Sequence, residues 1–501
     1  MVCPESNADS FWGYRHALPL FGKKATFPPL GLLTVAAMIP SRHSVTLVDM
    51  NVRRLAAADV QRADVVFVSA MTVHRESFRE VVALCNDLGV PVVAGGPYPS
   101  TCYRDIEGVD HFIVNEAEET LASFLRDFEE GSAKSLYCAQ DAPELSSTPA
   151  PRYDLIDVSD YLNLALQFTR GCPYDCDFCE ITAMFGRRIR AKTDAQFLAE
   201  LEVVYRTGYR GTIFIVDDNF IGSPGRSASV LQAIANWQQQ RAYPFSFMTQ
   251  VSVDLGTRDE LMDLMKEANF SLVFVGLESP FDESLRLTRK HQNLRADMLC
   301  SVRLMQAKGL VVMGGFIVGF DTDPPAIFDM QIEFITSAAI PIAMAGMLVA
   351  TRGTPLHSRL EQEGRLTGDF SGDPILLMEP NFVPRMPLDV LQKGYARIID
   401  ELYAPDSYYG RCLELLARLP KVPINRRDPS SLAKTRRRAF VIRAFLRLAF
   451  SAGGLQFLRY IRAAAKINPA NLPVSFLFAL QGRHFMRLRR EFLRRHASRP
   501  R

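Results

Sequence analysis

Short apolar runs recur along the first 130 residues and alternate with amphipathic stretches. The runs cover residues 44–49, 63–70, 91–96 and 109–115. Between two of them, HRESFREVVALCNDLG places four apolar residues on one helical face: Phe78, Val81, Val82 and Cys85. Strands that are apolar on both faces need helices on both sides of their sheet. The alternation therefore predicts a doubly wound parallel α/β sheet.

A second series of strands and helices follows a polar, proline-rich stretch. Its strands are expected at about 164–169, 212–217, 245–251, 272–277, 311–318 and 344–349. The helices between them carry start signals, including two capping boxes, Thr193 with Gln196 and Thr257 with Glu260. Six such units predict a partial (βα)6 barrel, whose working residues lie at the C-terminal ends of its strands.

The chain then divides into five stretches. We expect an N-terminal Rossmann-like domain over 1–139, a linker over 140–158 and the barrel over 159–358. A helical C-terminal appendage over 359–420 and a basic amphipathic helical tail over 421–501 complete the chain.

The net charge of +3 is unevenly distributed. Residues 421–501 hold 20 Lys and Arg but only two acidic residues, whereas the first 420 residues hold 38 basic and 53 acidic ones. In the tail, Arg alternates with apolar residues at helical spacing, which is typical of helices that lie on an anionic membrane. The apolar residues expected to insert are Phe440, Ile442, Phe445, Leu446, Phe450 and Phe457. A solvated helical tail is the alternative. Nucleic acid is not expected as a partner, because no RNA-binding module is recognised.

Composition narrows the class of protein further. Apolar residues make up 48% and charged residues 23% of the 501 residues, which excludes a disordered chain, a collagen and a disulfide scaffold. The first residues, MVCPESNADSFW, lack the features of a signal peptide, and no uncharged apolar run reaches the ~18 residues that span a bilayer. We expect a cytoplasmic protein, with its tail on the inner face of the membrane. Six of its nine cysteines are scattered and are expected to be small buried or idle thiols: Cys3, Cys85, Cys102, Cys138, Cys300 and Cys412.

The other three cysteines, Cys172, Cys176 and Cys179, form a C-x3-C-x2-C pattern directly after the first barrel strand. Three thiolates on one loop can bind three irons of a 4Fe-4S cube, which leaves the fourth iron open to a substrate. A structural zinc site needs four closed ligands, and the region 160–200 offers no second Cys or His pair. The pattern therefore favours an iron–sulfur cluster over zinc or accidental clustering.

With its flanks, RGCPYDCDFCEI resembles the signature of the radical S-adenosylmethionine (SAM) superfamily, including the aromatic Phe178. The resemblance implies that the open iron binds SAM and that the reduced cluster cleaves it to a 5′-deoxyadenosyl radical. It further implies SAM contacts at strand ends, from Asp217, Asp218, Gln250, Glu278 and, in the glycine-rich strand GGFIVGF, Gly319. Adjacent carboxylates in a loop otherwise stay solvated or cap a helix, and glycine in a strand equally relieves crowding.

Residues 28–125 resemble the cobalamin-binding domain that precedes many radical SAM enzymes, through PPLGLLTVAAMIP, VDMN, VSAMTV, AGGPYPS and NEAEETL in this order. The resemblance implies that Ser69, Gly95 and Gly96, which follow strands, pack against the corrin and its nucleotide tail. Ordinary βα turns are the alternative.

Two departures from that domain change the expectations. Relatives with a lower axial histidine carry it in D-x-H-x-x-G, but this chain has Asn51 at that position. Cobalamin should therefore bind with no histidine below cobalt, and His74 is expected to start a helix rather than to be a ligand. The first strand is shortened to MVCPES, which predicts an incomplete sheet edge.

Residues 355–415 resemble an appendage in a branch that includes the hopanoid C-2 methylase and bacteriochlorophyll side-chain methylases. The resemblances together imply a cobalamin-dependent radical SAM enzyme that methylates an unactivated carbon of an apolar small molecule, an isoprenoid lipid or a tetrapyrrole. One SAM would methylate cobalamin, and a second would supply the radical. The implied partners are the substrate, a reductant such as flavodoxin or ferredoxin, and an anionic membrane surface.

Three alternatives are open at this point. A cobalamin-dependent cyclase or rearrangement enzyme would use the same cofactors without net methyl transfer. A tRNA methylthiotransferase would need a different N-terminal domain with three cysteines and an RNA-binding barrel, neither of which is recognised. A non-catalytic iron–sulfur electron carrier or sensor would not cleave SAM.

Overall fold

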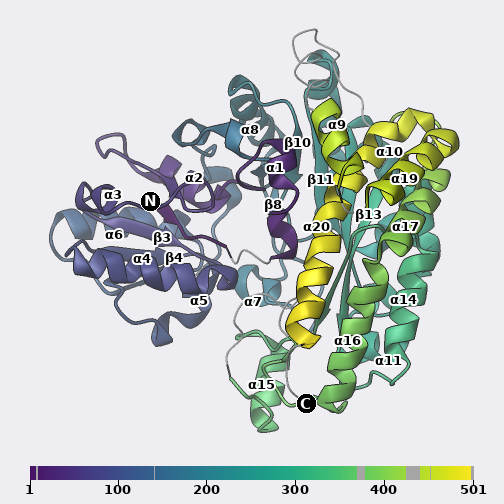
Figure 1. The fold of residues 1–501 in the computed structure, drawn as a ribbon. Coiled ribbons are helices and arrows are strands. Elements are labelled where there is room, and N and C mark those ends of the chain that lie inside the picture. The colour runs from purple at the N-terminus through teal and green to yellow at the C-terminus, as the bar shows by residue number, and fades with distance from the viewer. Residues whose placement is uncertain (7–9, 140, 369–377, 425–440, 452, 498–501) are drawn as a thin grey trace.

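The computed structural model describes residues 1–6, 10–139, 141–368, 378–424, 441–451 and 453–497. Two α/β units lie side by side, the first purple and blue and the second teal to green (Figure 1). Helices from the C-terminal part of the chain, green to yellow, cover one side of the second unit.

The N-terminal unit is a six-stranded parallel sheet with the order β2-β1-β3-β4-β5-β6. Its strands are β1 (Val2–Cys3), β2 (Val48–Asp49), β3 (Val66–Ser69), β4 (Val92–Gly95), β5 (His111–Val114) and β6 (Leu136–Cys138). The principal helices that cover it are α2 (Leu30–Met38), α4 (Arg75–Asp87), α5 (Pro97–Cys102) and α6 (Ala117–Glu129).

Both faces of this sheet are apolar, as the sequence predicts. Val66 and Val68 belong to a core that includes α4, whereas Phe67 between them belongs to a core that includes α6. This confirms the doubly wound α/β arrangement. The expectation of an incomplete edge is wrong, because the short β1 lies inside the sheet, paired with β2 at Val2↔Val48 and with β3 at Val2↔Val68.

The second unit is a six-stranded parallel sheet with the order β14-β13-β12-β11-β10-β7, which confirms the partial barrel. Its strands are β7 (Leu164–Leu166), β10 (Thr212–Ile215), β11 (Ser246–Val251), β12 (Phe270–Glu278), β13 (Val311–Val318) and β14 (Ala343–Met347). The helices between them are α8 (Asp194–Arg206), α9 (Pro224–Gln240), α10 (Asp259–Glu267), α11 (Asp282–Leu287), α12 (His291–Leu294), α13 (Met298–Ala307) and α14 (Ile327–Ser337).

One of the two predicted capping boxes forms. Thr193 precedes α8 and accepts a hydrogen bond from the Gln196 amide at 3.1 Å. The prediction for Thr257 is wrong. A 3-10 turn extends to that residue, α10 begins only at Asp259, and the Thr257 hydroxyl donates to the Asp254 carbonyl instead.

The barrel interior is recognised from alternate exposure along each strand. In β12, Leu272, Phe274 and Gly276 are partly exposed, whereas the intervening Val273 and Val275 are fully buried beneath helices. Since successive side chains of a strand point to opposite faces, the partly exposed set lines the interior.

The open side of the barrel is covered by both ends of the chain. Trp12 donates a hydrogen bond to the Met344 sulfur at 3.1 Å, and its ring lies 5.7 Å from that of Phe274. Phe11 stacks on Phe485 of α20 (Leu472–Ala497), with 4.6 Å between the ring centroids. The N-terminal segment thus lies between the barrel strands and α20.

The appendage and the tail pack together as helices. The helices are α15 (Pro355–Gln362), α16 (Leu388–Leu402), α17 (Pro405–Arg418), α19 (Gly454–Ile467) and α20. Tyr409 of α17 stacks on Tyr460 of α19 at 4.5 Å, and Tyr408 bonds the Phe478 carbonyl of α20. Much of the tail's apolar surface therefore packs against protein.

Among the residues expected to insert into a membrane, Phe457 is instead buried, and Phe445 packs against it at 5.3 Å. Ile442, Leu446 and Phe450 are exposed, and Phe440 lies outside the described residues. No helix in the described part of the chain combines the length and apolar character needed to cross a bilayer.

Candidate active site

The three clustered cysteines lie on one loop at the C-terminal end of the barrel strands. The loop leaves β8 (Thr169–Arg170), which pairs with β9 (Arg190–Ala191). Gly171 has φ +95°, and a Cβ there would lie 2.7 Å from the Arg188 carbonyl oxygen, so this turn requires glycine. The amide of Cys172 then bonds the Gly186 carbonyl at 3.3 Å, which fixes the start of the loop.

The donor set fits an iron–sulfur cluster. Cys172, Cys176 and Cys179 are free thiols, and burial raises the pKa of Cys179 to about 12. Metal binding must therefore displace a proton that the protein alone holds tightly. In the described part of the chain, no three His, Cys, Asp or Glu side chains converge on one point as ligands of a single ion do. A cube does not need such convergence, because each thiolate binds a different iron.

Two side chains that sequence reasoning missed approach this loop, Lys290 from the turn after α11 and Gln292 from α12. Lys290 forms an ion pair with Glu278 at 2.8 Å and lies 5.9 Å from the Phe178 ring centroid. Burial opposes its charge, but Glu278 and Cys176 outweigh burial and raise the pKa of Lys290. Gln292 donates from Nε2 to the Cys176 sulfur at 3.6 Å, and its buried Oε1 has no described hydrogen-bond partner.

The adjacent carboxylates after β10 point to different sides. Asp217 is fully buried in the wall, where it accepts hydrogen bonds from the Phe168 amide at 2.7 Å and the Thr169 hydroxyl at 2.6 Å. Asp218 follows the interior-facing positions of β10 and accepts from the Gly171 amide at 3.0 Å. Burial raises the pKa of Asp218 to about 6. We therefore keep the SAM contact as a proposal for Asp218 and assign Asp217 to holding the start of the cysteine loop.

The other predicted SAM contacts fall into two groups. Gln250 lies one residue before the end of β11, on the interior side. Glu278 ends β12 with φ +60°, and its carboxylate accepts a hydrogen bond from Lys290. Gly319 is different, because it lies in the turn after β13 with φ +99°. A Cβ on Gly319 would lie 3.3 Å from the Leu391 side chain of α16. Gly319 therefore packs against a helix in this structure.

The rest of the glycine-rich strand accommodates aromatic rings. A Cβ on Gly315 would lie 2.9 Å from Phe274, and one on Gly314 would lie 2.6 Å from Phe316. Phe178 packs at 6.0 Å from Phe320, which holds the cysteine loop against the end of β13. The relief of crowding thus accounts for Gly314 and Gly315.

The predicted cobalamin contacts meet at the C-terminal edge of the first sheet. Ser69 pairs with Gly95 in register, and Gly96 has φ +89°. A Cβ on Gly96 would lie 2.6 Å from the Ser69 hydroxyl oxygen. The edge is therefore lined with small residues, which suits the close approach of a flat macrocycle.

Asn51 and His74, the two residues considered as axial ligands, both make hydrogen bonds within the protein. The Asn51 side chain donates to Asp49 at 2.8 Å and accepts from the Ser6 hydroxyl at 2.8 Å. His74 ends the 3-10 turn Thr72–His74 and directly precedes α4, and its Nδ1 accepts from the Met71 amide at 3.1 Å. Burial lowers the pKa of His74 to about 4.

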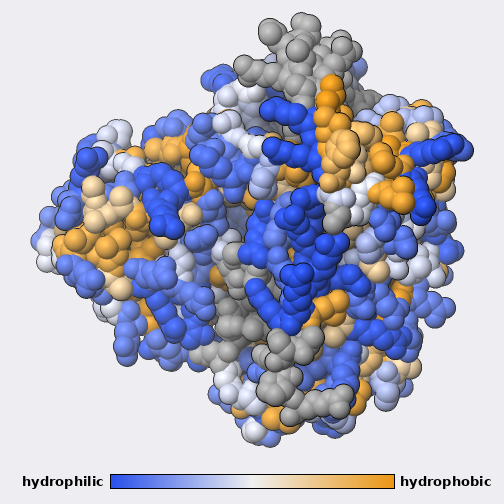
Figure 2. Space-filling view, in the orientation of Figure 1, coloured by the Kyte–Doolittle hydropathy of each residue, from blue (hydrophilic) through white to orange (hydrophobic). Residues whose placement is uncertain are grey.

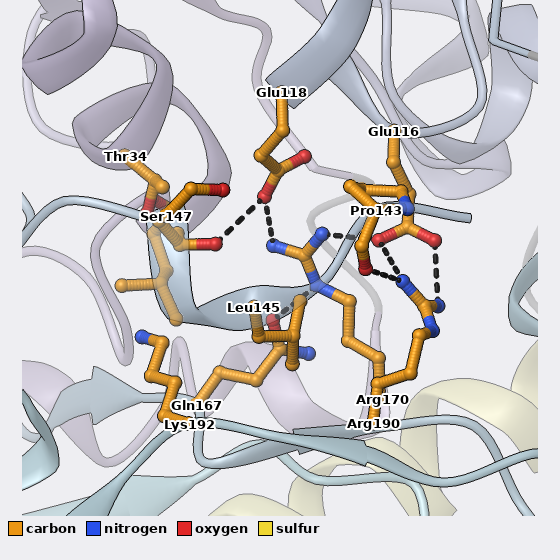
Figure 3. Close-up of polar contacts among 12 residues, drawn as sticks. Thr34, Glu116, Glu118, Pro143, Leu145, Ser147, Gln167, Arg170, Arg190 and Lys192 are labelled. Atoms are coloured by element: carbon orange, nitrogen blue, oxygen red, sulfur yellow. Dashed lines mark hydrogen bonds and ion pairs between the residues drawn. The ribbon is translucent and has the colours of Figure 1, made fainter. Parts of the chain in front are cut away.

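A buried charge network joins the first unit to the two-stranded sheet β8–β9, whose strands precede and follow the cysteine loop (Figure 3). Glu116 and Glu118, at the start of α6, face Arg170 of β8 and Arg190 of β9. The Arg190–Glu116 pair measures 2.6 Å and the Arg170–Glu118 pair 2.8 Å, and none of the four side chains is more than 12% exposed. Since Arg170 lies two residues before Cys172, the network links the edge of the first sheet to the cysteine loop.

Comparison with known proteins agrees with these features. The B12 binding domain matches residues 24–125, the radical SAM superfamily matches 166–335, and a domain of unknown function matches 354–498. An uncharacterized methyltransferase of Synechocystis is 39% identical over 80% of this chain and 75% of its own length. The hopanoid C-2 methylase of Rhodopseudomonas palustris is 32% identical over 80% of this chain and 76% of its own.

The fold is also found in a solved structure. The cobalamin-dependent SAM radical enzyme OxsB, with aqua-cobalamin and SAM bound, has a TM-score of 0.62 at 14% identity and covers 99% of this chain and 80% of that one. The chain belongs to the cobalamin-dependent radical SAM methyltransferases. Its cofactors are a 4Fe-4S cluster, SAM and cobalamin.

Proposed function

We propose that this methyltransferase acts on an unactivated carbon of an apolar small molecule, an isoprenoid lipid or a tetrapyrrole. The observation that carries the proposal is the interior of the barrel, where partly exposed side chains are aromatic or aliphatic: Trp12, Phe214, Phe274, Ile317 and Met344. Such a lining suits a substrate without charge in the part that enters. A relative of 32% identity that is named for a hopanoid supports the same class.

The cluster, SAM and cobalamin supply the radical and the methyl group when they are bound. The residues of the chain have three tasks. Cys172, Cys176 and Cys179 bind the cluster, Asp218 and Gln250 contact SAM, and the edge at Ser69 and Gly96 receives the corrin. The apolar interior excludes water, which protects a reactive carbon radical from side reactions.

The experiment supplies SAM with a deuterated methyl group and a reductant such as flavodoxin or ferredoxin to the reconstituted enzyme. One set of reactions contains isoprenoid lipids and a second contains tetrapyrroles. The proposal predicts a labelled methyl group in a product of one set. Labelled product from polar substrates alone would contradict it, and 5′-deoxyadenosine formed with an unlabelled product would favour the cyclase or rearrangement alternative.

The second part of the proposal concerns location. The tail carries a net charge of +18, with 20 basic and two acidic residues over 421–501, and exposes several apolar side chains. An anionic membrane attracts basic segments and takes up apolar residues beside them. We propose that the enzyme works in the cytoplasm and binds the inner face of the membrane, where apolar substrates gather. Flotation of the intact protein with vesicles tests this part.

A further inference from the structure

A cavity of about 210 Å³ lies on the outer side of the helical layer, away from the barrel interior. It is bounded by α17, the helical residues 441–449, α19 and α20. Aromatic and aliphatic side chains form one wall, including Tyr409, Leu448 and Phe457. The lining also includes a row of arginines on one face of α20: Arg483, Arg487 and Arg490.

The arginine row is not balanced by acidic groups in the part of the chain that the structure describes. No described ion pair or hydrogen bond involves the guanidinium groups of Arg483, Arg487 or Arg490. Burial, followed by the charges of Arg487, Arg447 and Arg490, lowers the pKa of Arg483. Three arginines therefore line one cavity with like charge, and Arg447 adds its charge to theirs at Arg483, an arrangement that attracts an anion.

Exposed apolar residues lie on the segments beside this basic cavity, and we call them the apolar rim. The exposed large apolar residues of 441–458 are Phe450, at 86% exposure, with Leu455 at 62%, Ile442 at 59%, Leu446 at 47%, Leu458 at 41% and Val441 at 38%. All six lie on the helical residues 441–449, on the turn that follows them or on α19, and other residues of these segments line the cavity. In Figure 2, hydrophobic surface near α19 adjoins the hydrophilic surface that follows α20. A solvated helix has no need of so many exposed apolar side chains in one place.

We infer that this cavity binds the phosphate of an anionic phospholipid headgroup while the apolar rim enters the bilayer surface. Arginine is suited to the headgroup because its planar guanidinium binds phosphate oxygens in pairs. The rim favours a lipid over a free phosphate, because only a lipid brings acyl chains to meet Phe450 and Leu455. The inference rests on the membrane part of the proposed function and is independent of the methylation chemistry.

The position of the site leaves the catalytic end of the molecule free. Figure 1 places α19 at the opposite end of the barrel from α7 (Ile181–Phe185), the helix that follows the cysteine loop. Docking through this surface therefore anchors the enzyme without covering the strand ends that carry the thiols.

The test is flotation of the full chain with vesicles of phosphatidylcholine alone or with a share of phosphatidylglycerol. One variant combines Arg487→Gln with Arg490→Gln, and a second carries Phe450→Ser. The matched control combines Arg62→Gln with Arg79→Gln, which removes the same charge from exposed positions of the N-terminal unit. Thermal unfolding of each variant verifies that it is folded. Inorganic phosphate alone is tested as a ligand by its effect on thermal unfolding.

The wild-type protein and the charge control should float with the anionic vesicles and not with phosphatidylcholine. The double arginine variant should bind roughly tenfold less tightly, and Phe450→Ser should also bind less. Equal flotation of wild type and the arginine variant would overturn the cavity assignment but keep the membrane location. No flotation of the wild type would overturn both. Stabilisation by free phosphate, with undiminished flotation of Phe450→Ser, would assign the cavity to a soluble anion and contradict the lipid.

Discussion

The two parallel sheets end in edges of different chemistry. At the edge of the first sheet, Asn51 and His74 are held by the protein itself, and the remaining surface is made of Ser69, Gly95 and Gly96. At the edge of the barrel, thiols, a carboxylate and a buried lysine gather around one loop. The first edge thus provides a surface of small residues, and the second provides side chains that can bind metal ions.

This difference matches what the two groups of cofactors need. A corrin already carries four nitrogen ligands to its cobalt, so a binding surface has to fit the ring rather than coordinate the metal. An iron–sulfur cluster has no such ligands of its own and depends on the protein for thiolates. The buried network of Glu116, Glu118, Arg170 and Arg190 then determines how one edge faces the other.

The largest effect should follow from loss of the thiols. Replacing Cys172, Cys176 or Cys179 with Ala should abolish cluster binding and SAM cleavage, because three thiolates are needed to hold the cube. Iron analysis should give about four irons per chain in the wild type and in Cys300→Ala, whose exposed thiol lies among the scattered cysteines. Iron retained by a triple variant would refute the assignment.

The link between the edges should give the next largest effect. Glu116→Gln leaves Arg190 buried without its full partner, which should lower the free energy of unfolding by about 3–5 kcal/mol. Cobalamin should still bind, but product formation should fall at least roughly tenfold, since small misplacements of reacting groups are costly. The control is Glu129→Gln at the other end of α6, which breaks an exposed pair with Arg42 and should leave the stability nearly unchanged. If Glu116→Gln formed product at the wild-type rate, the charge network would not be needed to align the two edges.

A smaller effect should follow from loss of the hydrogen bond that Gln292 donates to the Cys176 sulfur. Gln292→Met removes the donor to the Cys176 sulfur. A hydrogen bond of about 1 kcal/mol corresponds to about 40 mV for a one-electron couple, so the cluster potential should become more negative by that order. Redox titration followed by electron paramagnetic resonance measures it. Gln306→Met, a buried glutamine that bonds the Ala338 carbonyl, should leave the potential unchanged, and an equal shift in both variants would contradict the account.

The smallest effect is expected at the first edge, where no protein group should coordinate cobalt. The resonance spectrum of the bound cob(II)alamin form should show no nitrogen superhyperfine splitting, and His74→Ala should not change it. Splitting from an imidazole or from the dimethylbenzimidazole base would contradict the claim that no nitrogen ligand binds cobalt from below.

The sequence predicted the strands well because apolar patterning is local. Residues 311–318 were expected as a strand, and β13 has the same bounds. The strand β6 was not predicted, because two of its three residues are exposed and no apolar run marks it. Lys290 and Gln292 were missed for another reason, since they reach the cysteine loop only through the fold and carry no local signal.

Two further regions show why the direction of a side chain is hard to predict from sequence. Alternate exposure along β10 separates Asp218 from Asp217. The apolar run TIFIV before them has no alternation that shows which carboxylate faces the interior. The basic amphipathic tail was ambiguous in principle, because a helix that packs on protein and one that lies on lipid need the same apolar stripe. Phe485 and Phe492 of α20 are buried against the protein, whereas Phe450 is not.

The most direct test of the central claim is a labelled-methyl experiment with the holoenzyme, in which both products of SAM are counted. If the two edges cooperate, an apolar product should gain one deuterated methyl group, with equal amounts of S-adenosylhomocysteine and 5′-deoxyadenosine per product. Protein without cobalamin should form no methylated product. An unlabelled product, or methylation that proceeds without cobalamin, would contradict the account.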